Sequence, residues 1–259
     1  MKKILVVFIS ILILMPEVKS STTSASSYIL MDQNTGRVLL SKDKDSQRLI
    51  ASITKIMTCI LALESGKSED VVIVDDNATS AYGSGIYIEV GEEIKLKDLL
   101  YGLMLRSGND AASMIAAYVS GSIEEFVKLM NNKAKELGMK NTIFYTPSGL
   151  PTPHGNLSSV YDMAILTRYA MQNKEYREIV STKKYKTATN KKNYIWHNKN
   201  KLLKYDYITG GKTGYTEESG RTLVSTANID NMNLIVVTIR DSDDWNTHLE
   251  LYNYAKDNY

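Results

Sequence analysis

The sequence contains one cysteine, Cys59, in 259 residues, so no disulfide can form within the chain. The fold must therefore be held by its apolar core, which a chain of this length can supply. On a predicted helix, Cys59 is expected to be buried packing. An excess of one charge is also missing, because 31 Lys and Arg residues stand against 29 Asp and Glu. Without a basic arm, the charge pattern gives no indication of nucleic-acid binding.

Long apolar runs are scarce, with one exception at the start of the chain. Residues 4–15 are almost wholly apolar, follow Lys2 and Lys3, and precede a Ser- and Thr-rich stretch. This plan predicts a signal peptide over residues 1–20 and export across the cytoplasmic membrane, to the extracellular space or cell wall. The apolar core is short for a membrane span, but an uncleaved N-terminal anchor stays open. Residues 1–20 hold three lysines and one glutamate, so a mature chain would be formally neutral.

Three Ser-x-x-Lys pairs occur, beginning at Ser41, Ser52 and Ser181. The first and last lie in charge-rich stretches, where serine and lysine are both expected to face water. Ser52 instead opens a segment with apolar residues at helical spacing, which predicts a buried helix. Ser52 and Lys55 are therefore the candidate pair.

Ser52 and Lys55 lie three positions apart, so a helix would place both side chains on one face. The helix N-terminus and burial both disfavour an ammonium group there. Lys55 is therefore expected to be a neutral amine for part of the time and to act as general base for the serine. The free backbone N–H groups of the first turn are expected to face a developing oxyanion.

A second motif, with Ser107 and Asn109 flanking a glycine, follows residues 97–106 and precedes an apolar-periodic run over residues 111–119. It is predicted to form a tight turn between two helices, and a simple helix cap is the alternative. In the functional interpretation the Ser107 hydroxyl relays a proton between Lys55 and a leaving amine. The Asn109 amide would hold Lys55 and a substrate peptide bond.

The third motif lies in a predicted strand over residues 207–216, followed by strands over 221–228 and 233–240. Lys212 could be a charge on an edge strand. In the functional interpretation Lys212 orients a substrate carboxylate and the Ser107 hydroxyl. Thr213 would donate to that carboxylate, Gly214 would let a bound peptide approach as an added strand, and the N–H of Tyr215 would be a second oxyanion donor.

A coarse reading of the whole chain predicts one α+β domain. Two strands, over residues 27–32 and 37–41, precede a helix-rich middle over residues 52–200, and a closing helix is expected over 245–254. Strands from both ends of the chain would form one antiparallel sheet with helices packed on it. Within the middle, helix starts are predicted at Ser122 and Ser159 and a helix stop at Gly138.

Five stretches resemble the low-molecular-mass penicillin-binding proteins, the D-alanyl-D-alanine carboxypeptidases of the serine peptidase S11 group. The resemblance extends over roughly residues 27–255 and is carried by residues 51–58, 105–112, 147–151, 161–164 and 211–216. It implies a serine β-lactamase/DD-peptidase-like fold in which a helix-rich insertion carries the Ser-x-Asn motif.

The resemblance also implies acyl transfer on the peptidoglycan stem peptide. Ser52 would attack the carbonyl between two terminal D-alanines, release the last one, and leave an acyl-enzyme that water resolves. Penicillin would acylate the same serine and clear slowly. No metal or other cofactor is implied, and a monomer is expected.

Some features depart from the family pattern. Ile50 stands where many members have proline, and Thr209, Gly210 and Gly211 replace the usual run before the lysine. Residues 21–259 are expected to be the catalytic domain alone, without the C-terminal β-domain and amphipathic helix of many relatives.

Particular residues bear on three rival functions. A class A β-lactamase would carry a glutamate within residues 147–159, and none is present. A zinc peptidase needs two histidines, an aspartate and a glutamate base, and Asn193 stands where that glutamate would be, near His197. A non-catalytic peptidoglycan-binding relative usually loses the nucleophile or the base, whereas this chain keeps all three motifs.

Overall fold

The computed structural model describes residues 23–79, 82–151 and 154–259. The predicted signal peptide, over residues 1–20, lies outside the described residues. Within the described ranges, no helix has the length and apolar character needed to cross a membrane.

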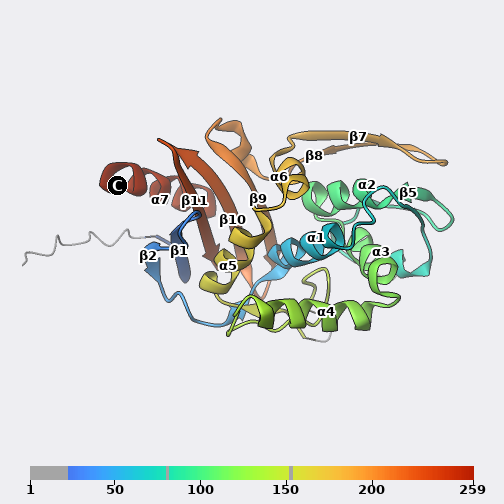
Figure 1. The fold of residues 1–259 in the computed structure, drawn as a ribbon, viewed down its shortest axis with the longest axis horizontal. Helices are drawn as coiled ribbons and strands as arrows, with labels where there is room; N and C mark the ends of the chain where they lie inside the picture. Colours follow the sequence, from blue (N-terminus) through green and yellow to red (C-terminus); the bar gives the residue numbers. More distant parts are fainter. Residues whose placement is uncertain (1–22, 80–81, 152–153) are drawn as a thin grey trace, which may run out of the picture.

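The central sheet has five antiparallel strands in the order β2-β1-β11-β10-β9 (Figure 1). They are β1 (Ser27–Asp32), β2 (Val38–Lys42), β9 (Ile208–Thr216), β10 (Gly220–Ile229) and β11 (Met232–Ile239). Strands from the two ends of the chain thus meet in one sheet, and the predicted α+β architecture is confirmed. The second part of β11, residues 234–239, is buried throughout because helices cover both faces of the sheet, which explains why it is apolar except for Thr238.

Helix α7 (Asp244–Asn258) packs on one face of the sheet and α5 (Val160–Ala170) on the other. The remaining helices are α1 (Lys55–Glu64), α2 (Leu96–Tyr101), α3 (Asn109–Ser120), α4 (Ile123–Glu136) and α6 (Lys174–Ser181). Short helical turns are η1 (Ala51–Thr54), η2 (Asp76–Ala78) and η4 (Lys201–Lys204), and η3 (Gly102–Arg106) is a π-helical turn that continues α2.

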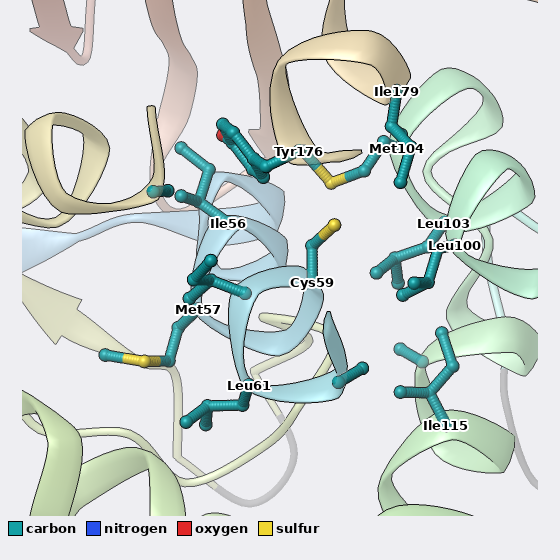
Figure 2. Packing of buried hydrophobic residues seen from close by; sticks show 14 of the residues in the cluster. Ile56, Met57, Cys59, Leu61, Leu100, Leu103, Met104, Ile115, Tyr176 and Ile179 are labelled. Atoms are coloured by element: carbon teal, nitrogen blue, oxygen red, sulfur yellow. The ribbon is translucent and has the colours of Figure 1, made fainter. Parts of the chain in front are cut away.

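Helix α1 runs through the larger of the two cores. In Figure 2, the side chain of Cys59 points from α1 towards Met104, and Tyr176 and Ile179 of α6 lie nearby. The cysteine is fully buried, as expected, and burial raises the pKa of its thiol. Because α1 is buried on all sides, the side chains of its first turn are held in fixed positions.

The predicted helix signals are confirmed. The Ser122 hydroxyl accepts from the N–H of Glu125 at 3.1 Å and opens α4. The Ser159 hydroxyl accepts from the N–H of Asp162 at 3.1 Å and opens α5. Gly138, two residues after the last residue of α4, adopts a φ of 73°, the conformation that favours glycine at a helix end.

The middle of the chain is less helical than predicted. Residues 184–197 form a hairpin of β7 (Lys184–Ala188) and β8 (Asn193–His197), and two further antiparallel pairs occur. These are β4 (Val71–Ile73) with β5 (Glu93–Lys95), and β3 (Arg48–Leu49) with β6 (Leu157–Ser158). The hairpin was missed because the inward-facing side of β7 holds a tyrosine and a threonine between lysines, a weak apolar signal.

Candidate active site

Ser52, predicted to open the helix, lies in the η1 turn, so the α-helix starts about one turn later than predicted. Helix α1 begins at Lys55. Lys55 Nζ lies 3.0 Å from Ser52 Oγ, 2.8 Å from Asn109 Oδ1 and 2.6 Å from the carbonyl oxygen of Ser148. Three oxygen atoms from three parts of the chain therefore hold the amine beside the serine.

Lys55 is fully buried, and its pKa falls from the ordinary value to about 7. Burial is the main cause, because it disfavours the charged amine. The positive charge of Lys199 lowers the pKa further, and the negative charge of Asp110 opposes both. Near neutral pH a large fraction of Lys55 is therefore a free amine that can accept a proton from a hydroxyl.

The second motif forms a turn between η3 and α3, as predicted. Ser107 has a φ of 65°, in the left-handed region, and is nearly fully buried. Its hydroxyl accepts from Lys212 Nζ at 3.1 Å, which links the second motif to the third. The amide of Asn109 bridges two elements, since Oδ1 accepts from Lys55 and Nδ2 donates to the carbonyl oxygen of Tyr82 at 2.6 Å.

The third motif lies on β9, which ends the five-stranded sheet among the described residues. Lys212 is 1% exposed, and its Nζ also donates to the carbonyl oxygen of Thr213 at 2.7 Å. Burial, followed by the charges of Lys55 and Lys199, holds the pKa of Lys212 well below its usual range. The two buried lysines thus disfavour charge on each other.

Gly214 has a structural role in addition to the predicted one. A Cβ at this position would lie 2.3 Å from Thr222 Oγ1, 3.0 Å from the backbone nitrogen of Ser52 and 3.1 Å from that of Ile53. The missing side chain therefore lets β9 lie close against the turn that carries Ser52.

The three motifs meet at a cleft of about 340 Å³. Its lining contains the predicted residues Ser52, Ser107, Thr213, Gly214 and Tyr215, and five that the motifs did not indicate: Ser84, Lys199, Arg221, Asp244 and Trp245. The buried side chains of Lys55 and Lys212 reach this cleft through their hydrogen bonds to the two serines.

Two contributors to the site were missed by reasoning from single motifs. Ser148 supplies a carbonyl oxygen to Lys55, and Gly149 beside it has a φ of 84°. The stretch over residues 147–151 carried the family resemblance, so a signal existed. Lys199 donates from Nζ to Ser84 Oγ at 3.0 Å across the cleft wall. It lies in a lysine-rich stretch, and nothing in the sequence set it apart.

The other Ser-x-x-Lys pairs lie elsewhere. Ser41 is on β2, and the exposed Ser181 donates from its hydroxyl to the carbonyl oxygen of Arg177 at 2.8 Å. The histidines are separate from each other as well. His154 and His197 are exposed, whereas His248 is buried against Ser225 and Thr238.

A model of the peptidase S11 family, described as D-alanyl-D-alanine carboxypeptidase, matches residues 15–243. The chain belongs to this family. The S11 chain is 42% identical over 220 residues to the D-alanyl-D-alanine carboxypeptidase DacF of Bacillus subtilis, covering 82% of this chain and 56% of DacF. It is 33% identical over 235 residues to DacD of Escherichia coli, covering 85% and 58%. The S11 chain thus spans somewhat more than half the length of these curated relatives.

Solved structures agree with this family and with its fold. A D-alanyl-D-alanine carboxypeptidase of Mycobacterium tuberculosis superposes with a TM-score of 0.88 at 27% identity, covering 92% of this chain and 93% of that one. A mutant of the Streptomyces K15 DD-transpeptidase gives a TM-score of 0.85 at 28% identity, covering 90% and 98%.

Proposed function

We propose that this S11 protein is a serine-type D-Ala-D-Ala carboxypeptidase that removes the terminal D-alanine from peptidoglycan stem peptides. Residues 21–259 would form its catalytic domain, exported across the cytoplasmic membrane. The observation that carries the proposal is the pair of Ser52 and Lys55. A buried amine with a pKa of about 7 lies 3.0 Å from a hydroxyl at the edge of a cleft.

In the acylation step, neutral Lys55 takes the proton of Ser52, and Oγ attacks the carbonyl carbon between the two D-alanines. The negative charge that develops on the carbonyl oxygen is stabilised by the backbone N–H groups of Ser52 and Tyr215. The close approach of β9 to the Ser52 turn at Gly214 supports this pairing, because it brings the two segments together.

The C–N bond then breaks, and the leaving nitrogen needs a proton. Ser107 delivers it and is reprotonated from Lys55, so that D-alanine departs as the free amine and Lys55 is neutral again. Water next attacks the ester carbonyl and gives a proton to Lys55, which returns it to Ser52 Oγ as the ester C–O bond breaks and the shortened peptide leaves. Penicillin would acylate Ser52 by the same first step.

The second N–H of Asn109 and the edge of β9 would hold the substrate backbone, while Lys212 and Thr213 bind its terminal carboxylate. Binding a carboxylate favours the charged form of Lys212. That charge in turn disfavours a proton on the nearby Lys55. Substrate binding would therefore help to keep the base neutral.

The test is release of D-alanine from a small N-acylated tripeptide ending in D-Ala-D-Ala. Wild type should release one D-alanine per peptide, and Ser52→Ala should release none while keeping its thermal unfolding temperature. A folded wild-type protein that leaves this peptide intact would contradict the proposal, as would a fully active Ser52→Ala variant.

A further inference from the structure

The hairpin β7–β8 and the turn after it carry a strong excess of positive charge. Between Glu178 and Asp206 the sequence has no acidic residue and eight lysines, namely Lys183, Lys184, Lys186, Lys191, Lys192, Lys199, Lys201 and Lys204. Since residues 21–259 are formally neutral, the rest of that span carries an excess of eight negative charges. The charge of the molecule is therefore sharply divided, and the hairpin extends along one edge of the molecule, beside α2 (Figure 1).

The inner face of the hairpin is anchored to the body. Tyr185 OH and Thr187 Oγ1 donate to the two carboxylate oxygens of Asp98, at 2.5 and 2.8 Å. Tyr194 OH donates to Glu92 at 2.8 Å. Both carboxylates are buried and lie on the inner side. The hairpin is thus attached to the body, with its acidic neighbours on the inner face.

The outer face presents the lysines. Lys184 pairs across the strands with His197, and Lys186 with Ile195, and all four side chains are exposed. In the described part of the chain, no carboxylate lies within 4 Å of the side-chain nitrogen of five exposed lysines: Lys183, Lys184, Lys186, Lys201 and Lys204. At the tip, by contrast, Lys192 pairs with Glu89.

This cationic face adjoins the active-site cleft. The N–H of Asn198 donates to the carbonyl oxygen of Lys183 at 2.9 Å, which ties the base of the hairpin together. The next residue, Lys199, lines the cleft and bonds to Ser84. Positive charge therefore runs from the cleft wall along the outside of the hairpin.

We propose that the outer face of the hairpin together with its base, defined by Lys184, Lys186 and, at the base, Lys183, and called the lysine face, docks the polymer that carries the substrate peptides. The inference rests on the proposed function. A polymer bearing many peptides that end in free carboxylates is a polyanion, complementary in charge to this face. Because the face adjoins the cleft, docking raises the local concentration of peptide ends at Ser52.

An anionic membrane is the rival occupant. Binding of a protein face to a lipid surface grows with the apolar area that it buries as well as with charge. Apart from Ala188, the outward positions of the two strands offer one apolar side chain, Ile195, which is 57% exposed. The chemistry of the face therefore favours a carboxylate polymer over a bilayer.

The test is co-sedimentation with insoluble peptidoglycan freed of attached phosphate polymers. Wild type should bind this polymer and should be released from it between 50 and 300 mM NaCl. When the carboxylates of the polymer are amidated, wild type should bind at least tenfold less. Lys183→Gln, Lys184→Gln and Lys186→Gln combined should reduce binding about tenfold. The matched control combines Lys135→Gln, Lys140→Gln and Lys256→Gln, three exposed lysines elsewhere, and should bind as wild type does.

Release of D-alanine from the small tripeptide, measured in parallel, tests the proposed function separately. All three proteins should be equally active there, which also shows that the hairpin variant is folded. Equal polymer binding by wild type and the hairpin variant would overturn the docking proposal, and so would undiminished binding to the amidated polymer. Hairpin-dependent flotation with phosphatidylglycerol vesicles, without hairpin-dependent binding to the polymer, would assign the face to a membrane instead. If the triple variant loses tripeptide activity, the salt dependence of wild-type binding decides the docking proposal: wild type that stays bound to the polymer at 300 mM NaCl would overturn it.

Discussion

At the scale of single residues, the protonation of Lys55 governs the proposed chemistry. Its pKa of about 7 arises from burial first and from the charge of Lys199 second. Below that pH the amine gains a proton and can no longer take one from Ser52. We expect the rate of penicillin acylation to fall about tenfold per pH unit below 7 and to level off above it. Stopped-flow acylation measured from pH 5 to 9 gives this profile.

Lys199 provides a control for that profile. Lys199→Gln removes a positive charge near Lys55, so the pKa of Lys55 should rise and the midpoint of the profile should move to higher pH. Lys55→Arg should be nearly inactive at every pH, because a guanidinium stays protonated. A flat profile in wild type would mean that Lys55 is not the base.

Lys212 separates recognition of the substrate from the chemistry. Lys212→Gln should lose about 2 kcal/mol of transition-state stabilisation on a peptide ending in free D-Ala-D-Ala, because a desolvated charge pair is lost. The peptide with an amidated C-terminus should be a poor substrate for wild type and suffer little further from the mutation. Measuring kcat/KM for both peptides checks this, and equal losses would point to Ser107 as the group on which Lys212 acts.

Only some residues of the candidate site could be predicted from the sequence. Ser52, Lys55, Ser107 and Lys212 could be named as candidates because each belongs to a short motif with a chemical reason for its spacing. Lys199 was not found, because its contact with Ser84 joins residues 115 positions apart, and only the fold brings them together. Electrostatic partners of this kind carry no local pattern.

At the scale of elements, the loop around Gly149 supports the Ser52 turn. A Cβ on Gly149 would lie 2.0 Å from the carbonyl oxygen of Ala51, and its φ of 84° is strained for other residues. Gly149→Ala should therefore displace the loop, move the Ser148 carbonyl away from Lys55, and slow acylation at least tenfold. Unfolding should require about 2 kcal/mol less free energy.

Gly121 offers a matched control for that substitution. It has the same φ of 84° at the end of α3, but a Cβ there would meet no atom within 4 Å. Gly121→Ala should show the backbone strain alone, about 1 kcal/mol in chemical denaturation, with acylation unchanged. An equal loss of acylation in both variants would show that the contact with Ala51 is unimportant.

Elements with a strong local signal were predicted well. The range of β1 matches the predicted strand over residues 27–32, and the serine caps of α4 and α5 lie where expected. The β7–β8 hairpin was not predicted because its inward positions hold aromatic and hydroxyl side chains. These side chains become an inner face only through their bonds to Asp98 and Glu92, far away in the sequence.

At the scale of the whole molecule, a buried histidine couples stability to acid. His248 of α7 contacts Ser225 and Thr238 of the sheet, and burial lowers its pKa to about 3. In the unfolded chain His248 binds a proton below about pH 6.5, whereas in the folded chain it stays neutral down to about pH 3. The free energy of unfolding that depends on neutral His248 is therefore fully present above pH 6.5 and is lost as the pH falls towards 3. We expect His248 to contribute about 5 kcal/mol to the full acid loss between these two pH values.

Urea denaturation of wild type and His248→Gln between pH 4 and 8 measures this contribution. The difference in unfolding free energy between the two proteins should shrink as the pH falls below 6.5, because only wild type carries the buried imidazole. A difference that stays constant over this range would show that His248 is not kept neutral by the fold. Protonation of Lys55 changes the unfolding free energy of both proteins equally, so its effect cancels in the difference between them.

The central claim is that Ser52 is the nucleophile, and the mass of the protein after treatment with penicillin tests it most directly. Intact-mass analysis should show one added penicillin per chain, and peptide mapping should place it on Ser52. The adduct should be absent from Ser52→Ala, whose thermal unfolding should match wild type. An adduct on Ser41 or Ser181, or unchanged labelling of folded Ser52→Ala, would contradict the account.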